Sequence, residues 1–187
     1  YSWFRDSLHD RNQKVVLKGI SSPIRSITAG VPQGSILGPL LFKIFINDFG
    51  YGLNSDSFLF ADDTSLLLQY TPNQIQRAVQ QVNDDLEAIL NWASLWRIQF
   101  NTAKTEVMNF SPSGKIENGL VINFGINTLV PVKKHTHLGI VLSSDLKWTL
   151  HIDKVINECC KLLGLLRRQA SNLSFSQKCT IFSAIIR

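Results

Sequence analysis

The clearest hydrophobic pattern in the chain lies between residues 75 and 96. Apolar side chains recur there at spacings of three and four, as one face of an α-helix requires. They are Ile75, Val79, Val82, Leu86, Ile89, Ala93 and Trp96. The preceding Thr71-Pro72-Asn73-Gln74 supplies a capping residue, a proline at the first helical position and a glutamine at the third. The sequence therefore predicts one long amphipathic helix that ends at about Arg97.

Short runs rich in β-branched and aromatic residues predict strands on both sides of this helix. Val15 to Ile20 and Ile24 to Thr28 form a candidate hairpin with its turn between Gly19 and Pro23. Ser57 to Phe60 and Thr64 to Gln69 form a second candidate hairpin around Ala61-Asp62-Asp63. After the helix, four strands separated by turn sequences are predicted at residues 106–110, 120–124, 128–132 and 137–142.

Three further helices are predicted. Ser35 can cap a helix over Ile36 to Phe49, with Pro39 in the tolerated first turn. The faces of this segment are nearly all apolar, so we expect it to be buried. Helical spacing returns from Thr149, and Ser174-Phe-Ser-Gln177 caps another helix. Because strands and helices do not alternate regularly, the order favours an α+β layer over a parallel doubly wound sheet.

Composition narrows the class of protein. The chain has 187 residues, of which 44% are apolar and 18% charged, and this excludes disorder and a disulfide scaffold. The longest nearly apolar stretch, Ile36 to Ile46, is interrupted by glycine, proline and lysine and is too short to span a bilayer. Cys159, Cys160 and Cys179 form no paired framework and no zinc motif, which indicates a reducing compartment.

Charge is distributed unevenly along the chain. The net charge is +5, from 19 basic and 14 acidic side chains. Residues 1–146 carry 12 of each, whereas residues 147–187 carry 7 basic and 2 acidic side chains. This asymmetry is typical of a C-terminal part that contacts a polyanion. A solvated helix face with spare lysines is the alternative that charge alone leaves open.

Asp62 and Asp63 are the first candidates for chemistry. They lie where two apolar strands are predicted to meet, so we expect the carboxylates to repel each other and to lose hydration. A divalent cation would relieve both costs, and a pair of such ions serves in-line phosphoryl transfer. The alternative is that aspartate is a favoured turn residue and the pair only makes the hairpin.

Residues 30–42 read Gly-Val-Pro-Gln-Gly-Ser-Ile-Leu-Gly-Pro-Leu-Leu-Phe. The glycines let a backbone approach a ligand closely, and the helix start at Ser35 offers N–H groups to an anion. A glycine- and proline-rich loop that only enters a buried helix is the alternative. Seventeen residues separate this string from Phe60-Ala61-Asp62-Asp63. In this order and spacing the two motifs resemble those of the reverse transcriptases of non-LTR retrotransposons, close to the jockey-like and related LINE-type elements.

The resemblance covers nearly the whole chain. It includes Trp3 to Lys18, Trp96 to Asn101 with Lys104 and Thr105, and His137-Leu138-Gly139 followed by Asp145-Leu146-Lys147-Trp148. It implies an α+β polymerase palm, an antiparallel sheet packed on helices, over residues 1–142. A primer-grip exit and a partial helical thumb would occupy residues 143–187.

The resemblance also implies roles for individual residues. Asp62 would be the principal metal ligand and Asp63 the secondary one. Lys104 would protonate the leaving pyrophosphate, and a surface lysine after a helix is the alternative. The incoming nucleotide and its template base would be bound by Gly30, Pro32, Gln33, Gly34, Phe60 and Ala61. The primer grip would be Leu138 and Gly139, and contacts to the nucleic-acid backbone would come from Lys161, Arg167 and Arg168.

One part of the family pattern has no counterpart in the sequence. The first palm motif supplies a further metal-binding aspartate on a strand, and Asp6 and Asp10, the acidic residues before Gly30, lack that context. We therefore expect a fragment without that motif, without the fingers and without much of the thumb. We also expect this fragment to be inactive by itself.

The partners follow from the same resemblance. Two Mg²⁺ ions, with Mn²⁺ as the alternative, would serve the complete enzyme. An RNA template, a DNA primer, deoxynucleoside triphosphates and the missing upstream fingers and palm segment of the same polypeptide would be the partners, with no membrane. The expected location is intracellular, in the nucleus or in a cytoplasmic ribonucleoprotein. The alternatives to an RNA-directed DNA polymerase are a non-catalytic nucleic-acid-binding remnant of a decayed element and a splicing maturase on the same palm.

Overall fold

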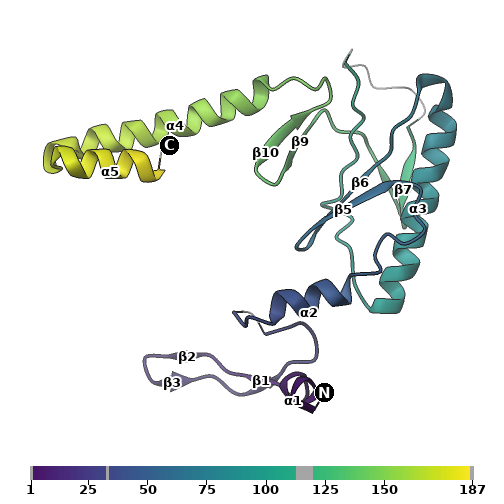
Figure 1. Cartoon of the computed structure of the whole chain (residues 1–187), viewed down its shortest axis with the longest axis horizontal. Coiled ribbons are helices and arrows are strands. Elements are labelled where there is room, and N and C mark those ends of the chain that lie inside the picture. Colours follow the sequence, from purple (N-terminus) through teal and green to yellow (C-terminus); the bar gives the residue numbers. More distant parts are fainter. Residues whose placement is uncertain (1, 33, 113–119, 186–187) are drawn as a thin grey trace. The chain divides into compact units, whose positions relative to one another are not determined.

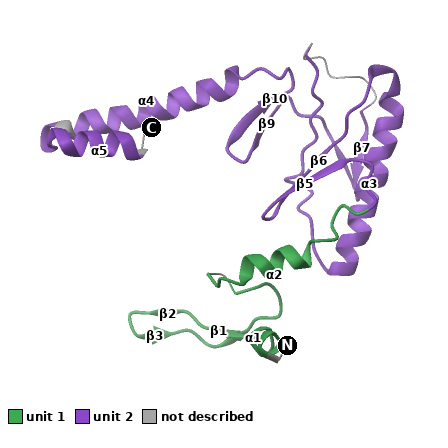
Figure 2. Cartoon of the chain, in the orientation of Figure 1, with its two compact units in different colours: residues 1–51 green, residues 52–187 purple. Residues whose placement is uncertain are grey.

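The computed structural model describes residues 2–32, 34–112 and 120–185, and it has the predicted α+β class (Figure 1). The chain divides into two compact units, Tyr1–Tyr51 and Gly52–Arg187 (Figure 2). This division rests on compactness. The predicted boundary between palm and thumb after residue 142 is a different one and stays a prediction.

The first unit contains two helices and two small antiparallel ladders. The helices are α1 (Ser2–Leu8) and α2 (Gly38–Phe45). The ladders pair β1 (Asn12–Gln13) with β4 (Arg25–Ser26) and β2 (Val16–Leu17) with β3 (Ile20–Ser21).

The predicted turn of this first hairpin is wrong by a few residues. Lys18 and Gly19 form it, with φ of +49° and +81°. Two left-handed residues in succession make a turn whose twist matches that of the flanking strands, and Gly19 adopts one of the two conformations without steric cost. Ser22 already belongs to the returning arm, since its N–H donates to the Val15 carbonyl at 2.8 Å.

Helix α2 is shorter and more exposed than predicted. Ser35 does act at its start, because its Oγ accepts from the Gly38 N–H at 2.9 Å, and Pro39 lies in the first turn. The prediction that this helix is buried is wrong: Leu40 is 50% and Ile44 64% exposed. The physical reason is that the other elements of the first unit are too small to cover the helix. The described elements of its own unit are one short helix and four two-residue strands, which cannot cover every side of an apolar helix.

The core of the second unit forms where a long helix packs against a hairpin. The 3₁₀ turn η1 (Pro72–Gln74) leads into α3 (Ile75–Trp96), as predicted. Leu86 of α3 is buried against β7 (Ile122–Phe124) and β8 (Asn127–Leu129). The side chains that pack around this cluster are Leu66, Val79, Val82, Leu90, Phe100 and Val107. The predicted amphipathic stripe is therefore the surface through which α3 packs against the β7–β8 hairpin.

Two strand predictions after α3 are wrong in detail. Residues 106–110 form no strand; Val107 makes a single bridge to Pro131. Residues 137–142 are not one strand, because β9 (Lys134–His137) and β10 (Ile140–Ser143) pair across a turn at Leu138 and Gly139. Both turn residues have positive φ, +48° and +86°, so the chain reverses at Leu138 and Gly139. The hydrophobic periodicity of the sequence gives no sign of this turn and therefore predicts one continuous strand.

The C-terminal helices begin where the sequence predicts. Helix α4 (Thr149–Gln169) is followed by η2 (Ala170–Asn172) and α5 (Phe175–Ile185). At the start of α5 the Gln177 N–H donates to Ser174 Oγ at 3.3 Å, and the Ser174 N–H donates to Gln177 Oε1 at 2.8 Å. These reciprocal bonds are the predicted capping box. Among the described helices, none combines the length and apolarity needed to cross a membrane.

Candidate functional site

Asp62 and Asp63 lie at the tip of a regular hairpin. Strands β5 (Asp56–Phe60) and β6 (Asp63–Leu67) pair in register from Asp56 opposite Leu67 to Phe60 opposite Asp63. This register leaves Ala61 and Asp62 as a two-residue turn and makes Asp63 the first residue of β6. Ala61 has φ of +53°, a conformation uncommon for a residue with a Cβ. The predicted hairpin is confirmed, and its ladder presents two adjacent carboxylates at one end.

The expected loss of hydration at this pair is not what the structure shows. Both aspartates are exposed, and the flanking Phe58 and Phe60 are themselves 56% and 63% exposed. Leu66 packs against the core, whereas Phe58, Leu59, Phe60 and Leu67 are exposed, and they do not enclose the carboxylates. In the described part of the chain, no group of three or more histidine, cysteine, aspartate or glutamate side chains is placed to hold a metal ion. What the tip offers is a pair of accessible hard oxygen ligands.

The base of the same hairpin is held by a buried carboxylate that sequence reasoning missed. Asp85 of α3 is 1% exposed. Its Oδ1 accepts from the Asn54 N–H at 2.7 Å and from Asn54 Nδ2 at 2.9 Å. Its Oδ2 accepts from the Ser55 N–H at 2.8 Å and from Ser55 Oγ at 2.5 Å. One sequence feature could have indicated its burial: Asp85 falls on the predicted apolar face of α3, beside Leu86.

These contacts determine the protonation of Asp85. Burial is the largest effect and by itself would raise the pKa of the carboxyl. The hydrogen bonds from the Ser55 hydroxyl, from the backbone N–H groups of Asn54 and Ser55 and from the Asn54 amide together outweigh it, so the pKa lies below the ordinary value of 3.8. Asp85 is therefore ionised at neutral pH.

We expect a specific acid dependence of stability from this site. A carboxyl with a depressed folded-state pKa stabilises the fold above its unfolded value, near 3.9, and loses this contribution as the pH falls through the folded pKa. Asp85→Asn removes that titration. In urea unfolding of the 187-residue chain at pH values between 7 and 2, the wild-type free energy of unfolding should fall more steeply below about pH 4 than that of Asp85→Asn.

The neighbouring Asp84 is the matched control, since it is exposed and its side chain accepts a hydrogen bond from Gln80 Nε2. Asp84→Asn should keep the wild-type acid dependence. An equally steep loss of stability with falling pH in Asp85→Asn and in the wild type would show that Asp85 does not titrate as described.

The glycine-rich loop lies in the first unit. Gly30 and Gly34 have φ of +81° and +82°, left-handed conformations that favour glycine. Arg11 holds the start of the loop, because its Nη2 donates to the Gly30 carbonyl at 2.5 Å and contacts the Ala29 carbonyl at 3.4 Å. Gln33, the residue predicted to face the incoming nucleotide, lies outside the described residues.

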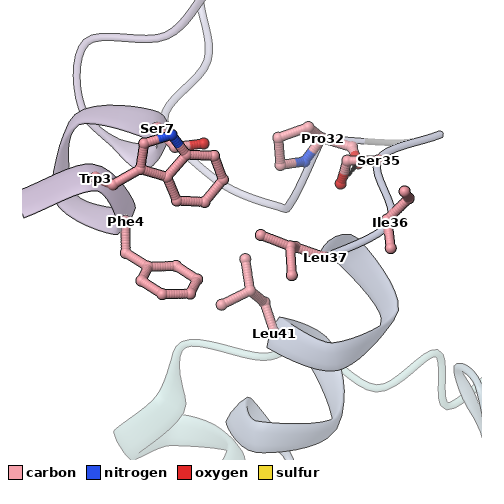
Figure 3. A pocket seen from close by; sticks show the side chains of 8 residues that line it. All are labelled: Trp3, Phe4, Ser7, Pro32, Ser35, Ile36, Leu37 and Leu41. Atoms are coloured by element: carbon pink, nitrogen blue, oxygen red, sulfur yellow. Dashed lines mark hydrogen bonds between the residues drawn. The ribbon is translucent and has the colours of Figure 1, made fainter. Parts of the chain in front are cut away.

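An apolar pocket of about 440 Å³ adjoins this loop between α1 and α2 (Figure 3). Trp3 and Phe4 line it from α1, and Leu37 and Leu41 from the segment of α2. The other described residues that line it are Ser7, Pro32, Ser35 and Ile36. Of the described residues in the predicted nucleotide site, Pro32 alone lines this pocket. The lining supplies van der Waals contact and few polar groups.

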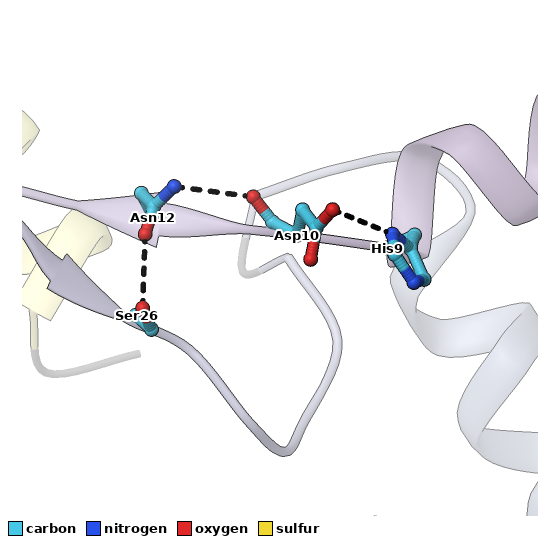
Figure 4. Close-up of polar contacts among 4 residues, drawn as sticks. All are labelled: His9, Asp10, Asn12 and Ser26. Atoms are coloured by element: carbon cyan, nitrogen blue, oxygen red, sulfur yellow. Dashed lines mark hydrogen bonds and ion pairs between the residues drawn. The ribbon is translucent and has the colours of Figure 1, made fainter.

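The two acidic residues before the glycine-rich loop, Asp6 and Asp10, lie on a helix and in the segment after it. Asp6 lies on α1, and Asp10 forms an ion pair with His9 at 2.9 Å. The Asp10 carbonyl accepts from Asn12 Nδ2, and Asn12 Oδ1 in turn accepts from Ser26 Oγ across the β1–β4 ladder (Figure 4). Neither aspartate stands on a strand, which agrees with the sequence-based expectation.

The predicted primer grip, Leu138 and Gly139, forms the turn of the β9–β10 hairpin. Lys154 of α4 donates from Nζ to the Gly139 carbonyl at 3.1 Å, and the Val141 N–H donates to His151 Nδ1 at 3.4 Å. These contacts attach α4 to the hairpin. His137 Nε2 also lies 3.4 Å from Ser65 Oγ of β6, so the β9–β10 hairpin contacts the β5–β6 hairpin.

The remaining predicted residues lie on the surface of the second unit. Lys104 is exposed in a turn after α3, where its N–H donates to the Asn101 carbonyl at 3.0 Å. In the described structure it makes no hydrogen bond or ion pair with Asp62 or Asp63. Lys161, Arg167 and Arg168 are exposed on α4.

Comparison with known proteins decides the family. Residues 2–165 match the sequence model of the family described as reverse transcriptase (RNA-dependent DNA polymerase). The chain belongs to the reverse transcriptase family. Its relatives include the RNA-directed DNA polymerase from mobile element jockey of Drosophila funebris, 29% identical over 94% of this chain and 20% of the relative. The Drosophila melanogaster jockey polymerase is 29% identical over 83% of this chain and 17% of its own length.

A third relative is the probable RNA-directed DNA polymerase from transposon X-element of Drosophila melanogaster, 27% identical over 100% of this chain and 21% of its own length. The resemblance to the non-LTR, jockey-like group is thus confirmed. The chain spans about a fifth of the length of these curated relatives. No solved structure matches it.

The predicted site residues of this reverse transcriptase chain fall into separate groups. The β5–β6 tip brings together Phe60, Ala61, Asp62 and Asp63. The loop residues Gly30, Pro32 and Gly34 belong to the other compact unit. The roles assigned to both groups by resemblance stay predictions, and the geometry within each group is what the structure adds.

Proposed function

We propose that this chain contributes to an RNA-directed DNA polymerase that extends a DNA 3′ end on an RNA template by two-metal nucleotidyl transfer. The observation that carries the proposal is the exposed Asp62–Asp63 pair at the tip of a paired hairpin, in a chain of the reverse transcriptase family. The substrates would be deoxynucleoside triphosphates, and the site of action the nucleus or a cytoplasmic ribonucleoprotein.

The donor set at the tip fits the proposed ions. Mg²⁺ takes one or two carboxylates together with substrate phosphates, and two accessible carboxylates are what Asp62 and Asp63 provide. Mg²⁺, or Mn²⁺ in its place, would activate the attacking 3′ oxygen and neutralise the leaving pyrophosphate. The β5–β6 ladder of this chain would hold the two carboxylates in one orientation. Lys104 would supply a proton to the pyrophosphate oxygen.

A two-ion site needs a further carboxylate ligand. Asp6 lies on α1 and Asp10 is paired with His9, so neither supplies a ligand from a strand. We therefore propose that the 187-residue chain alone does not extend a primer. The species to assay is the polypeptide encoded by the whole reading frame that contains this sequence.

Primer extension tests the function. The whole polypeptide, given an RNA template with an annealed DNA primer, deoxynucleoside triphosphates and Mg²⁺ or Mn²⁺, should lengthen the primer. Binding of the template–primer duplex without extension would instead support the non-catalytic remnant. Extension by the isolated 187-residue chain would contradict the proposed need for a further carboxylate.

We also propose that the basic side chains of α4 contact the backbone of the primer–template duplex. Each phosphate contact releases counterions, so log affinity should fall with log salt by roughly 0.7 to 0.9 per contacted phosphate. Replacing Arg167 and Arg168 together by Ala should lower affinity and flatten the slope by about one to two units, with little dependence on sequence. Fluorescence anisotropy of an RNA–DNA duplex at several salt concentrations measures both quantities.

Lys133 and Lys134 provide the control pair. They are also exposed and adjacent, but they lie in the part of the chain whose charges balance. The double alanine variant at Lys133 and Lys134 should keep a dependence of log affinity on log salt closer to the wild type than the Arg167 and Arg168 variant does. A slope unchanged in the Arg167 and Arg168 variant would show that α4 does not contact the backbone as proposed.

A further inference from the structure

The Asp85 carboxylate has no role in the function proposed so far, yet it is the largest fully buried side chain of the described structure. We propose that Asp85 is a positioning residue for the carboxylates of the β5–β6 tip. The inference rests on the proposed polymerase function and adds to it a residue that touches neither substrate nor metal.

Asp85, Asn54 and Ser55 form a clamp of four hydrogen bonds that requires a carboxylate. Two backbone N–H groups, one amide N–H and one hydroxyl converge on the two oxygens of Asp85. A carboxylate accepts at every position and so satisfies all four donors. An asparagine side chain offers one acceptor oxygen and an NH₂ group, which would face the N–H of Asn54 or of Ser55. A backbone N–H cannot turn away, so Asp85→Asn forces residues 54–55 to shift or leaves a buried donor unpaired.

The clamp lies at the base of the β5–β6 hairpin. Residues 54–55 immediately precede β5, and β5 pairs with β6 without a bulge up to Phe60 opposite Asp63. Five residues of strand, about 17 Å at the usual rise, therefore separate the clamp from the turn. A regular ladder transmits a change of position or direction at its base to its tip.

Helix α3 holds both strands of the hairpin near the same end. Asp85 holds the chain that enters β5, and Leu66 of β6 packs against the cluster that contains Leu86, the next residue of α3. Leu66 is the register partner of Ser57, close to the clamp. The tip itself is exposed. Its orientation thus depends on these anchors and on the contact between Ser65 Oγ and His137 Nε2, and among the three the Asp85 clamp is the one with four hydrogen bonds.

The test separates positioning from stability. In the whole polypeptide, pre-steady-state incorporation of one deoxynucleotide, with primer–template in excess over enzyme, gives a burst amplitude, which counts folded enzyme, and a burst rate, which reports the alignment of reacting groups. For Asp85→Asn we expect the rate to fall by about 10²-fold with little change in amplitude, since a misplacement near 1 Å costs about that much. The Mg²⁺ concentration for half-maximal rate should rise, while the affinity for primer–template should change little.

Two variants and a metal-free measurement keep the test decisive. Ser55→Ala removes one hydroxyl donor and leaves both backbone bonds, so it should fold and lose less rate than Asp85→Asn. Asp84→Asn, on the adjacent exposed position, should match the wild type. Amide hydrogen exchange in the 187-residue chain without metal should become faster at residues 54–60 in Asp85→Asn and not in Asp84→Asn.

The outcomes distinguish the two proposals. A wild-type polypeptide that does not extend a primer contradicts the polymerase function, and the positioning role with it. Wild-type extension combined with an unchanged burst rate and a reduced amplitude in Asp85→Asn overturns the positioning role alone and leaves Asp85 as a stabilising residue. If Asp85→Asn does not fold, an unchanged burst rate and Mg²⁺ dependence in Ser55→Ala overturn it equally.

Discussion

Asp62→Asn should abolish primer extension by the whole polypeptide and leave its fold intact. Asp62 is exposed at the turn of the β5–β6 hairpin, so its replacement by an isosteric amide disturbs no packing. The change removes the negative charge that a divalent ion requires, and loss of such electrostatic stabilisation costs on the order of 10²- to 10³-fold or more in rate. Extension of a labelled primer on an RNA template, together with circular dichroism of the variant, measures both expectations.

The same hairpin supplies a matched control. Asp56 is also an exposed aspartate, but it lies at the opposite end of the ladder, opposite Leu67. Asp56→Asn should extend primers like the wild type. Asp63→Asn should reduce extension less than Asp62→Asn, because Asp63 is the secondary ligand in the proposed arrangement. Activity of Asp62→Asn within a few-fold of the wild type would remove Asp62 from the mechanism.

Local signals in the sequence predicted the elements that depend on local physics. The stripe of α3 and the start signals at Thr71 and Ser174 depend on residues within one or two helical turns, and the structure confirms the helices that they predict. Ser174 makes the capping bonds, whereas the Thr71 hydroxyl bonds to the side chains of Asn73 and Gln74. The hairpin at Asp62 and Asp63 was predictable for the same reason, since two short strands flank a tight turn.

Turn positions were harder to predict, because they depend on which residues accept a positive φ. Lys18 and Leu138 do so beside a glycine, and neither is a residue type that favours this conformation. Each therefore looks like part of a strand in sequence. This is why one turn was misplaced and one hairpin was interpreted as a single strand.

The clamp at Asp85 could not be predicted, because its partners are 30 and 31 residues away in sequence. An aspartate on an amphipathic helix is usually exposed to solvent. Asp85 is buried because residues 54 and 55, which lead into β5, cover it and bond to it. The exposure of Asp62 and Asp63 was mispredicted for a related reason: apolar neighbours in sequence do not enclose a side chain unless a third element covers them.

Leu86→Asp should unfold the second unit of the 187-residue chain. Leu86 is 8% exposed and lies in the cluster with Ile122, Phe124 and Leu129. Truncation of a buried leucine alone costs about 2–5 kcal/mol, and an unpaired carboxylate in an apolar site adds several kcal/mol more. The sum is comparable to the whole stability of a typical domain, about 5–15 kcal/mol. Circular dichroism at neutral pH should show loss of the cooperative urea transition.

Leu95 is the matched control, because it lies on the same helix and is 83% exposed. Leu95→Asp introduces the same charge without burying it and should shift the urea midpoint only slightly, by about the 0.3–1 kcal/mol of an unfavourable charge near a helix C-terminus. Gln81→Ala, off the apolar stripe, should be nearly neutral. Similar midpoints for Leu86→Asp and Leu95→Asp would contradict the packing of α3 on the β7–β8 hairpin. The same result would remove the support that the α3 cluster gives to Leu66 and to the β5–β6 hairpin.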